Sequence, residues 1–377
     1  MFDADDNRYV DLTAGFGALV LGYGPNAATV AAAKEESELT LALGDVYASE
    51  TKVRAVEALA ALLPEGGARV LLGLSGADAV TAALKTAALA TKRPRIVAFE
   101  GAYHGLSHGP LAACGFAPSF REPFAAQLGT EVTFAPYATS EAMLDASLAS
   151  VRAALAKGDV AAVLVEPMLG RGGCVVPPER FLPELRALCD EAGALLVADE
   201  VWTGSGRSGA LAASVAAGVL PDVLCLGKGL GGGVPVSACI GRAHVMAAWG
   251  AHGGTTVHTG THFGSPAACA AVLATLEAIR EGDLCTRARE VGDAFRAELA
   301  EVCGPGRVRG RGLMVGVVLD DAGHALGVAR RMLARGYVVL TGGVRGDALT
   351  LSPPLTISPR LLSAAARALG EEMTAPR

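Results

Sequence analysis

The stretch Val223-Leu224-Cys225-Leu226-Gly227-Lys228-Gly229-Leu230-Gly231-Gly232-Gly233 joins a short apolar run to a lysine set among glycines. Four apolar residues in succession are typical of a strand that is buried on both faces. An isolated lysine charge is costly to bury, so a lysine at the end of such a strand is usually paired, neutralised or covalently bound. Desolvated lysines are also the amines that proteins use for Schiff bases. Lys228 is therefore either a loop lysine whose ammonium reaches water or a chemically active amine.

Two carboxylates follow another apolar run upstream of this lysine. Asp199 and Glu200 come directly after residues 194–198, less than one strand–helix–strand unit before Lys228. Parallel strands end at the same edge of a sheet, so Asp199 and Lys228 are expected to lie near each other. A carboxylate in this place can pair with a protonated ring nitrogen of a cofactor. The alternative is that Asp199 only caps the loop after its strand.

Short apolar runs alternate with alanine-rich amphipathic stretches over much of the chain. This alternation predicts a mostly parallel sheet in a three-layer α/β fold, with ligands at the carboxyl ends of the strands. The expected strands are residues 69–73, 96–99, 161–166, 194–199, 223–226 and 236–240, and the expected helices include residues 77–90, 178–192 and 265–280.

The pattern changes after residue 280 and indicates a smaller α+β unit. Its expected elements are helices 284–303 and 324–335 and strands 313–319, 337–341 and 349–351. The N-terminal segment, where residues 9–12 are typical of a strand, is expected to join this unit. We therefore predict a large domain of residues 40–280 and a small domain formed by residues 1–39 and 281–377.

Composition and charge argue against several classes of protein. With 377 residues, a formal net charge of −6 and a pI near 5.7, the chain is not expected to bind nucleic acid or an anionic membrane. No stretch reaches the roughly 18 uninterrupted apolar residues of a membrane span. The acidic first six residues lack the apolar segment of a signal peptide. The eight cysteines are scattered without a Cys-x-x-Cys pair, which favours reduced core residues in a cytoplasmic protein.

Other candidate site residues also follow expected strands. Ser75, Gly76 and Ala77 open an expected helix, where free backbone N–H groups can bind a phosphate, although Ser75 is equally typical of an ordinary N-cap. Tyr103 and His104 follow residues 96–99, and the flat ring of the tyrosine is suited either to stacking on a planar cofactor or to simple packing.

Glu166 ends the strand 161–166, directly before a proline and a glycine-rich turn. A buried carboxylate in such a place usually has an arginine partner.

Three further patterns resemble a dinucleotide-binding loop, a P-loop and a metal site, but each one lacks part of the motif. Residues 204–209 fit the G-x-G-x-x-G pattern of dinucleotide-binding loops, but they lie several residues beyond their strand. Gly227-Lys228 lacks the flanking residues of a P-loop. His252, His258 and His262 stand in a glycine- and threonine-rich loop without acidic neighbours, so we expect no metal site there.

Together these motifs resemble the class III aminotransferases, a family of fold-type I enzymes that depend on pyridoxal 5′-phosphate (PLP). They lie in the order of the family over nearly the whole chain and comprise residues 3–11, 75–80, 103–105, 165–167, 170–173, 199–201, 203–204, 206–209, 226–229, 261–266, 309–314 and 352–355.

The resemblance implies a seven-stranded, mostly parallel sheet in a large PLP-binding domain, a small α+β domain, and a role for each matching residue. Lys228 is expected to form the Schiff base and to move the α-proton, and Asp199 to pair with the pyridinium nitrogen. Val201 and Tyr103 are expected to pack on opposite faces of the ring, near His104 and Glu166. The cofactor-binding set that we predict is Ser75, Gly76, Ala77, Tyr103, His104, Glu166, Asp199, Val201, Lys228 and Thr261.

The match of Thr261 implies a homodimer, because in the family this residue completes the phosphate site of the neighbouring subunit. The partners implied are otherwise a small-molecule amino donor and a carbonyl acceptor.

The chain departs from the family pattern in the region that selects the substrate. Thr350 stands where many members have the arginine that binds a substrate carboxylate and pairs with the residue matching Glu166. Either Arg171 or Arg345 takes over that task, or one substrate has no carboxylate there. Trp202 replaces a glutamine common beside the cofactor oxygen. The sequence also begins late relative to the family, so Phe16 is expected to be the remaining N-terminal pocket residue.

We predict PLP-dependent transamination of an amino acid or amine, through a lysine Schiff base and a pyridoxamine phosphate form. The first alternative is an amino-acid racemase, epimerase or aminomutase on the same fold, favoured by Thr350 and by the glycine-rich stretch around Lys228. A second alternative is a protein that binds the cofactor or partners without turnover.

Overall fold

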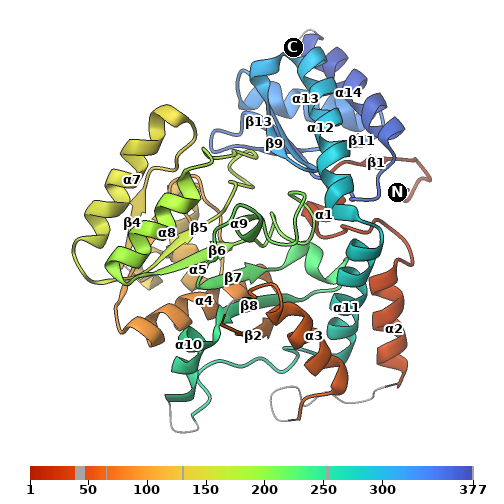
Figure 1. The fold of residues 1–377 in the computed structure, drawn as a ribbon. Coiled ribbons are helices and arrows are strands. Elements are labelled where there is room, and N and C mark those ends of the chain that lie inside the picture. Colours follow the sequence, from red (N-terminus) through yellow and green to blue (C-terminus); the bar gives the residue numbers. More distant parts are fainter. Residues whose placement is uncertain (39–46, 65, 130, 252–254, 376–377) are drawn as a thin grey trace.

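The computed structural model describes residues 1–377 except 39–46, 65, 130, 252–254 and 376–377. Its larger sheet has seven strands in the order β2-β8-β7-β6-β5-β3-β4 (Figure 1). The strands are β2 (Ala68–Gly73), β3 (Arg95–Phe99), β4 (Val132–Ala135), β5 (Val160–Val165), β6 (Leu195–Asp199), β7 (Val223–Leu226) and β8 (Ser237–Arg242). The predicted α/β fold with a mostly parallel seven-stranded sheet is thus confirmed.

Strand β8 runs against both of its neighbours, while the other pairs in this sheet are parallel. The antiparallel register places Val70 opposite Ile240 and Cys225 opposite Cys239. Every residue of β5 and β7 is buried, as expected for apolar strands covered on both faces. The sequence did not predict the edge strand β4.

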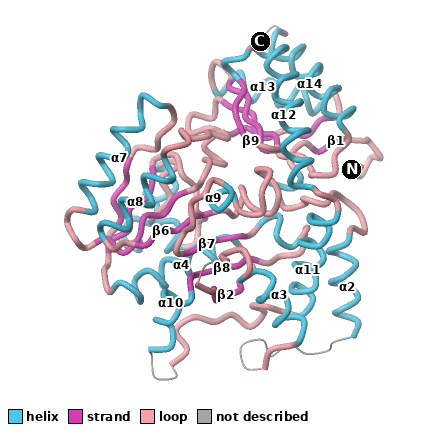
Figure 2. Tube along the Cα trace, viewed as in Figure 1, coloured by secondary structure: helices cyan, strands magenta, loops and turns pink. Residues whose placement is uncertain are grey.

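Helices cover both faces of this sheet, which makes the three layers visible in Figure 2. Alternate residues of each strand point to opposite faces. On one face, Val97 and Val163 share a core with α7 (Glu141–Leu155) and α8 (Phe181–Ala192). On the other face, Ala98 and Leu164 share a core with α4 (Gly76–Thr91).

Three more helices flank the sheet at its other end. Helices α3 (Glu50–Ala60) and α11 (Pro266–Glu281) bury apolar residues against β7 and β8. Helix α2 (Ala27–Glu38) packs on α11 through Ala28, Ala32 and Ala271. The close approach of these two helices depends on alanine, whose small side chain lets backbones come near each other.

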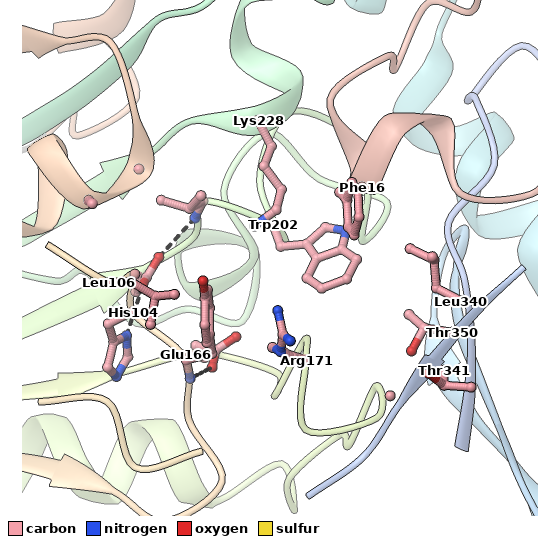
Figure 3. Close-up of a pocket in the computed structure, with 17 residues that line it drawn as sticks. Phe16, His104, Leu106, Glu166, Arg171, Trp202, Lys228, Leu340, Thr341 and Thr350 are labelled. Carbon is pink, nitrogen blue, oxygen red and sulfur yellow. Dashed lines mark hydrogen bonds and ion pairs between the residues drawn. The ribbon is translucent and has the colours of Figure 1, made fainter. Parts of the chain in front are cut away.

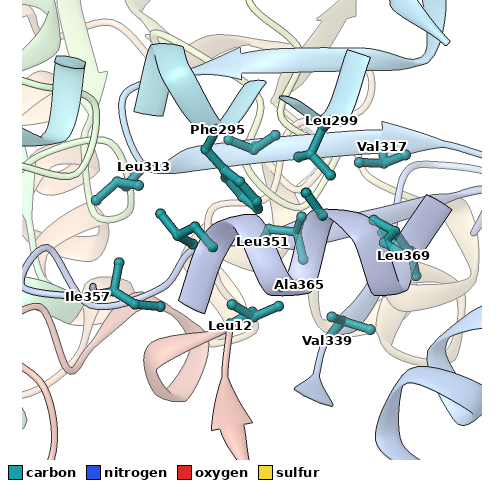
Figure 4. Close-up of a cluster of buried hydrophobic side chains, with 14 of the residues drawn as sticks. Leu12, Phe295, Leu299, Leu313, Val317, Val339, Leu351, Ile357, Ala365 and Leu369 are labelled. Atoms are coloured by element: carbon teal, nitrogen blue, oxygen red, sulfur yellow. The ribbon is translucent and has the colours of Figure 1, made fainter. Parts of the chain in front are cut away.

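The C-terminal unit contains a four-stranded antiparallel sheet in the order β12-β13-β10-β9. Its elements are α12 (Leu284–Cys303), β9 (Val308–Arg311), β10 (Met314–Val318), α13 (Ala322–Ala334), β11 (Tyr337–Val338), β12 (Leu340–Gly342), β13 (Ala348–Leu351) and α14 (Pro359–Thr374). The helices enclose a separate apolar core that includes Phe295, Leu299 and Leu351 (Figure 4). The smaller α+β unit predicted after residue 280 is present.

Part of the N-terminal segment lies against this unit. Strand β1 (Val10–Asp11) pairs in parallel with β11, and Leu12 lies in the apolar core of Figure 4. The N–H of Ser352 donates to the carbonyl of Leu12 at 2.7 Å. Because α2 packs instead on α11, residues 1–39 contribute to both units. The domain boundary at residue 40 lies outside the described residues, so the division at that point stays a prediction.

All eight cysteines are free thiols, and seven of them are buried. Within the parts of the chain that the structure describes, no helix combines the length and the apolar character needed to cross a membrane.

Candidate active site

A cavity of about 510 Å³ lies where the carboxyl ends of the large sheet face strands β12 and β13 of the C-terminal unit. Figure 3 shows the side chains that surround it. The lining residues are Phe16, Gly76, Ala77, Tyr103, His104, Gly105, Leu106, Glu166, Arg171, Asp199, Val201, Trp202, Lys228, Leu340, Thr341, Gly342 and Thr350. The structure therefore brings together all the predicted site residues except Ser75 and Thr261.

Lys228 enters the cavity from the end of β7, at the start of the short 3₁₀ turn η2 (Lys228–Gly231). Its backbone φ is +38°, in the left-handed region that a side chain rarely adopts, and such strain concentrates at functional sites. The Nζ atom lies 4.7 Å from the centroid of the Trp202 ring. Burial lowers the pKa of Lys228, and Arg171 adds to that effect while Asp199 and Glu166 oppose it. The site thus favours the neutral amine more than water does.

Buried contacts with His104 and Val201 fix the orientation of the Asp199 carboxylate. Its Oδ2 lies 2.7 Å from Nδ1 of His104, and its Oδ1 accepts a hydrogen bond from the N–H of Val201 at 3.1 Å. Asp199 is 4% exposed and His104 is 3% exposed, so water screens this pair little. His104 holds the carboxylate in one orientation at the cavity wall.

Helix α4 begins beside this pair and presents the backbone of Gly76 and Ala77 to the cavity. The first N–H groups of a helix have no acceptor within the helix and carry partial positive charge. Gly76 must lack a side chain, because a Cβ atom there would lie 2.6 Å from Cγ1 of Val201. The helix start is thus a narrow cradle suited to an anion.

Ser75 does not line the cavity, because its side chain caps α4. Its Oγ accepts from the N–H of Asp78 at 3.3 Å, while Oδ2 of Asp78 accepts from the N–H of Ser75 at 2.9 Å. This reciprocal pair is a capping box, which the spacing Ser-x-x-Asp could have indicated. A role for the Ser75 hydroxyl in binding stays a prediction.

Glu166 is a buried carboxylate that two backbone groups satisfy. Its Oε1 accepts from the N–H of Tyr103 at 2.8 Å and its Oε2 accepts from the N–H of Gly170 at 2.9 Å. Burial raises the pKa of Glu166 to about 7, although His104 opposes this and Asp199 adds to it. Thr350, 3% exposed, supplies no cation to pair with it.

The pH dependence of stability tests this description of Glu166. The folded chain holds a proton on this carboxyl up to about pH 7, whereas an ordinary glutamate releases it near 4.5. The free energy of unfolding contributed by this group is therefore greatest below the lower value and falls as the pH rises to the higher one, by about 3 kcal/mol. We expect Glu166→Gln to remove this fall in urea denaturation across the same pH interval.

The matched control for this experiment is Glu179→Gln, which changes an exposed glutamate. The control should keep the pH slope of the unchanged protein. Equal slopes for the unchanged protein and Glu166→Gln would show that Glu166 is ionised in the folded state as it is in water.

Thr261 lies outside the cavity in an exposed turn of this chain. Nearby, the rings of His258 and Phe263 approach with centroids 5.8 Å apart. His252 lies outside the described residues. Over the rest of the chain that the structure describes, no group of three or more His, Cys, Asp or Glu side chains could hold a metal ion.

Sequence reasoning did not find Leu106, Leu340, Thr341 and Gly342, which also line the cavity. Leu106 follows the motif at residues 103–105, and that position was a usable signal. The other three come from β12, and no local pattern marks them. Their place in the cavity depends on how the C-terminal unit packs over the large sheet.

Comparisons with known proteins agree on one family. The family model described as "Aminotransferase class-III" matches residues 1–371. The acetylornithine aminotransferase of Methanopyrus kandleri is 40% identical, covering 100% of this chain and 92% of its own. The 4-aminobutyrate aminotransferase of Mycobacterium leprae is 34% identical, covering 96% and 86%. The structure of a PLP-bound amine transaminase from an uncultivated Pseudomonas species superposes with a TM-score of 0.91 at 29% identity, over 99% and 92% of the two chains.

Proposed function

The chain belongs to the class III aminotransferases and is a PLP-dependent transaminase, and from this premise we propose that Lys228 is the residue that binds the cofactor. Its place in the wall of the cavity, from where its side chain extends toward the other lining residues, is the observation that carries the proposal. The neighbouring side chains supply a negative charge, a narrow anion cradle and an aromatic wall. These are the three features that a charged, planar, phosphorylated ring needs.

The residues present fit such a ring. The anion cradle at Gly76 and Ala77 suits a phosphate, and the missing Cβ atom of Gly76 lets Val201 pack against the start of the helix. The carboxylate of Asp199 suits a protonated ring nitrogen. The ring of Trp202 adds an aromatic wall, with its centroid 4.7 Å from Nζ of Lys228. When bound, PLP supplies an electron sink for the carbon that loses a proton.

Asp199 and His104 would act together on the proton of the ring nitrogen. The carboxylate of Asp199 would lie beside that nitrogen, and Nδ1 of His104 fixes the orientation of the carboxylate. A fixed charge in a buried site stabilises positive charge more strongly than it would in water. Tyr103 and Val201 line the cavity and would limit the movement of the ring between them.

Lys228 would also move the proton on the substrate carbon. Burial lowers the pKa of Lys228, and a neutral amine can accept a proton where an ammonium cannot. The same amine can return the proton to another atom. This proton transfer would be one step in passing an amino group from a donor to a carbonyl acceptor, and hydrolysis would release the carbonyl product of the donor.

We further propose that the enzyme is a homodimer in which Thr261 completes the phosphate site of the partner subunit. The position of this residue in an exposed turn, away from the cavity of its own chain, supports the proposal. We also propose that it works in the cytoplasm, because eight free thiols suit a reducing compartment.

Gel filtration with absorbance detection tests the function and the dimer together. We expect a visible absorption band of lysine-bound PLP that elutes with the mass of two chains, and an amine donor should remove this band. Isotope exchange at the substrate carbon without loss of the band would instead favour racemase chemistry. A band that elutes with the mass of one chain would contradict the role of Thr261.

A further inference from the structure

Arg171 occupies the tip of a turn that links the two units of the chain. The N–H of Gly173 donates to the carbonyl of Gly170 at 3.0 Å, which closes the turn. The carbonyl of Arg171 accepts from the N–H of Gly343 at 2.9 Å, so the C-terminal unit holds the backbone of the turn. The side chain enters the cavity, and Figure 3 shows its guanidinium among the lining residues.

Three aromatic rings surround this guanidinium. Its Cζ atom lies 5.0 Å from the ring centroid of Tyr103, 5.2 Å from that of Phe116 and 5.4 Å from that of Phe120. The rings of Phe116 and Phe120 are themselves stacked, with centroids 5.5 Å apart. Cation–π contacts of this kind hold the guanidinium plane while leaving its N–H edges available.

Arg171 has no charged partner among the residues that the structure describes. Among the described residues, no carboxylate lies within 4.0 Å of its guanidinium, and its N–H groups donate to no acceptor. The two oxygens of Glu166 are already bound to backbone N–H groups. By contrast, Arg345 donates to Asp347 at 2.8 Å and does not line the cavity.

We infer that Arg171 binds the carboxylate of an amino-acid substrate, in place of the arginine that Thr350 replaces. This inference rests on the proposed function of the cavity. The guanidinium fork matches a carboxylate with two parallel hydrogen bonds, and the aromatic rings fix its plane before the substrate arrives. Arg171 is thus a specificity-determining residue, and the substrate class is an amine that also carries a carboxylate.

A pair of amines of the same length tests the inference in the PLP-loaded enzyme. 4-Aminobutyrate and butylamine differ in that one has a carboxylate where the other has a methyl group. We expect Arg171→Gln to lower kcat/KM for 4-aminobutyrate by about 30- to 100-fold, which corresponds to about 2–3 kcal/mol. The value for butylamine should change by less than about threefold, since a neutral methyl group gains little from a cation.

The matched control is Arg345→Gln, which removes an arginine already paired with Asp347. This variant should leave the discrimination between the two amines unchanged. Arg171→Lys keeps the charge but loses the flat fork, so it should recover only part of the loss. Equal losses on both amines in Arg171→Gln would overturn the inference.

A binding measurement separates this inference from the proposed function. Butyrate carries the carboxylate without the amine, and calorimetry on the loaded protein reports its dissociation constant directly. We expect the Kd of butyrate to rise about 30-fold or more in Arg171→Gln, because the variant loses one charge-assisted pair of hydrogen bonds. The Kd should not rise in Arg345→Gln. An unchanged Kd in Arg171→Gln overturns the role of Arg171. Failure of the unchanged enzyme to react with any amine contradicts the proposed function instead, and the butyrate result then still decides about Arg171.

Discussion

Lys228→Ala is expected to lower the transamination rate by at least about 10⁴-fold and to remove the visible band of lysine-bound PLP. In the proposed function, Lys228 is both the amine that binds the cofactor and the base that moves the substrate proton, and the variant would lose both. Amine turnover and borohydride reduction followed by peptide mapping measure the two losses separately. In the unchanged protein the reduced cofactor should be found on the peptide that contains Lys228.

The folded structure should survive this substitution. The amine is buried and makes no hydrogen bond or ion pair among the described residues, so its removal leaves no partner unsatisfied. We expect the cofactor-free variant to unfold at the same temperature as the unchanged protein, or slightly above it. The exposed Lys157 offers a matched control, and Lys157→Ala should keep both the band and the turnover. Loss of folding in Lys228→Ala would favour a structural role for this lysine.

Asp199→Asn is expected to lower turnover by roughly 10² to 10³-fold, the size of effect seen when one preorganised electrostatic group is removed. The amide keeps the shape of the side chain but loses the charge that we propose stabilises the protonated ring nitrogen. It also replaces one oxygen with an NH₂ group. In the unchanged protein both oxygens have partners, because one lies beside Nδ1 of His104 and the other accepts from the N–H of Val201. Steady-state turnover at saturating PLP measures the loss.

The control for this substitution is Asp145→Asn, on the exposed face of α7. It should keep full turnover. We also expect the cofactor to dissociate more readily from Asp199→Asn, which a titration of PLP against the visible band detects. Full turnover in Asp199→Asn would contradict a role for this carboxylate at the ring nitrogen.

The part of the site that lies on the large sheet could be predicted because it depends on local pattern. Apolar runs ending in Glu166, Asp199 and Lys228 mark the carboxyl ends of three strands, and these strands lie together in the sheet. Parallel strands end at one edge, so residues far apart in the chain meet there. The same reasoning could not predict that β8 runs antiparallel to its neighbours, because an apolar run is the same signal for a parallel and for an antiparallel strand.

Other features escaped prediction for particular reasons. Strand β4 lies at the edge of the sheet and is only partly buried, so its residues lack a strong apolar run. The N-cap at Ser75 was one of two interpretations of that residue, but the reciprocal hydrogen bond from Asp78 was not predicted. Helix α2 packs on α11 and not on the C-terminal sheet, since alanines on both helices allow a close approach.

The sequence by itself determined an α/β fold with a lysine and two carboxylates at one sheet edge, because strand periodicity and strand ends are local properties. Only the tertiary structure shows that Arg171 lines the pocket without a charged partner among the described residues, whereas Arg345 pairs with Asp347 outside it. That placement depends on rings from Phe116 and Phe120 and on a backbone contact from Gly343, which chain folding brings to Arg171 from distant positions. Side-chain surroundings of this kind follow from packing between units, and no short stretch of sequence contains them.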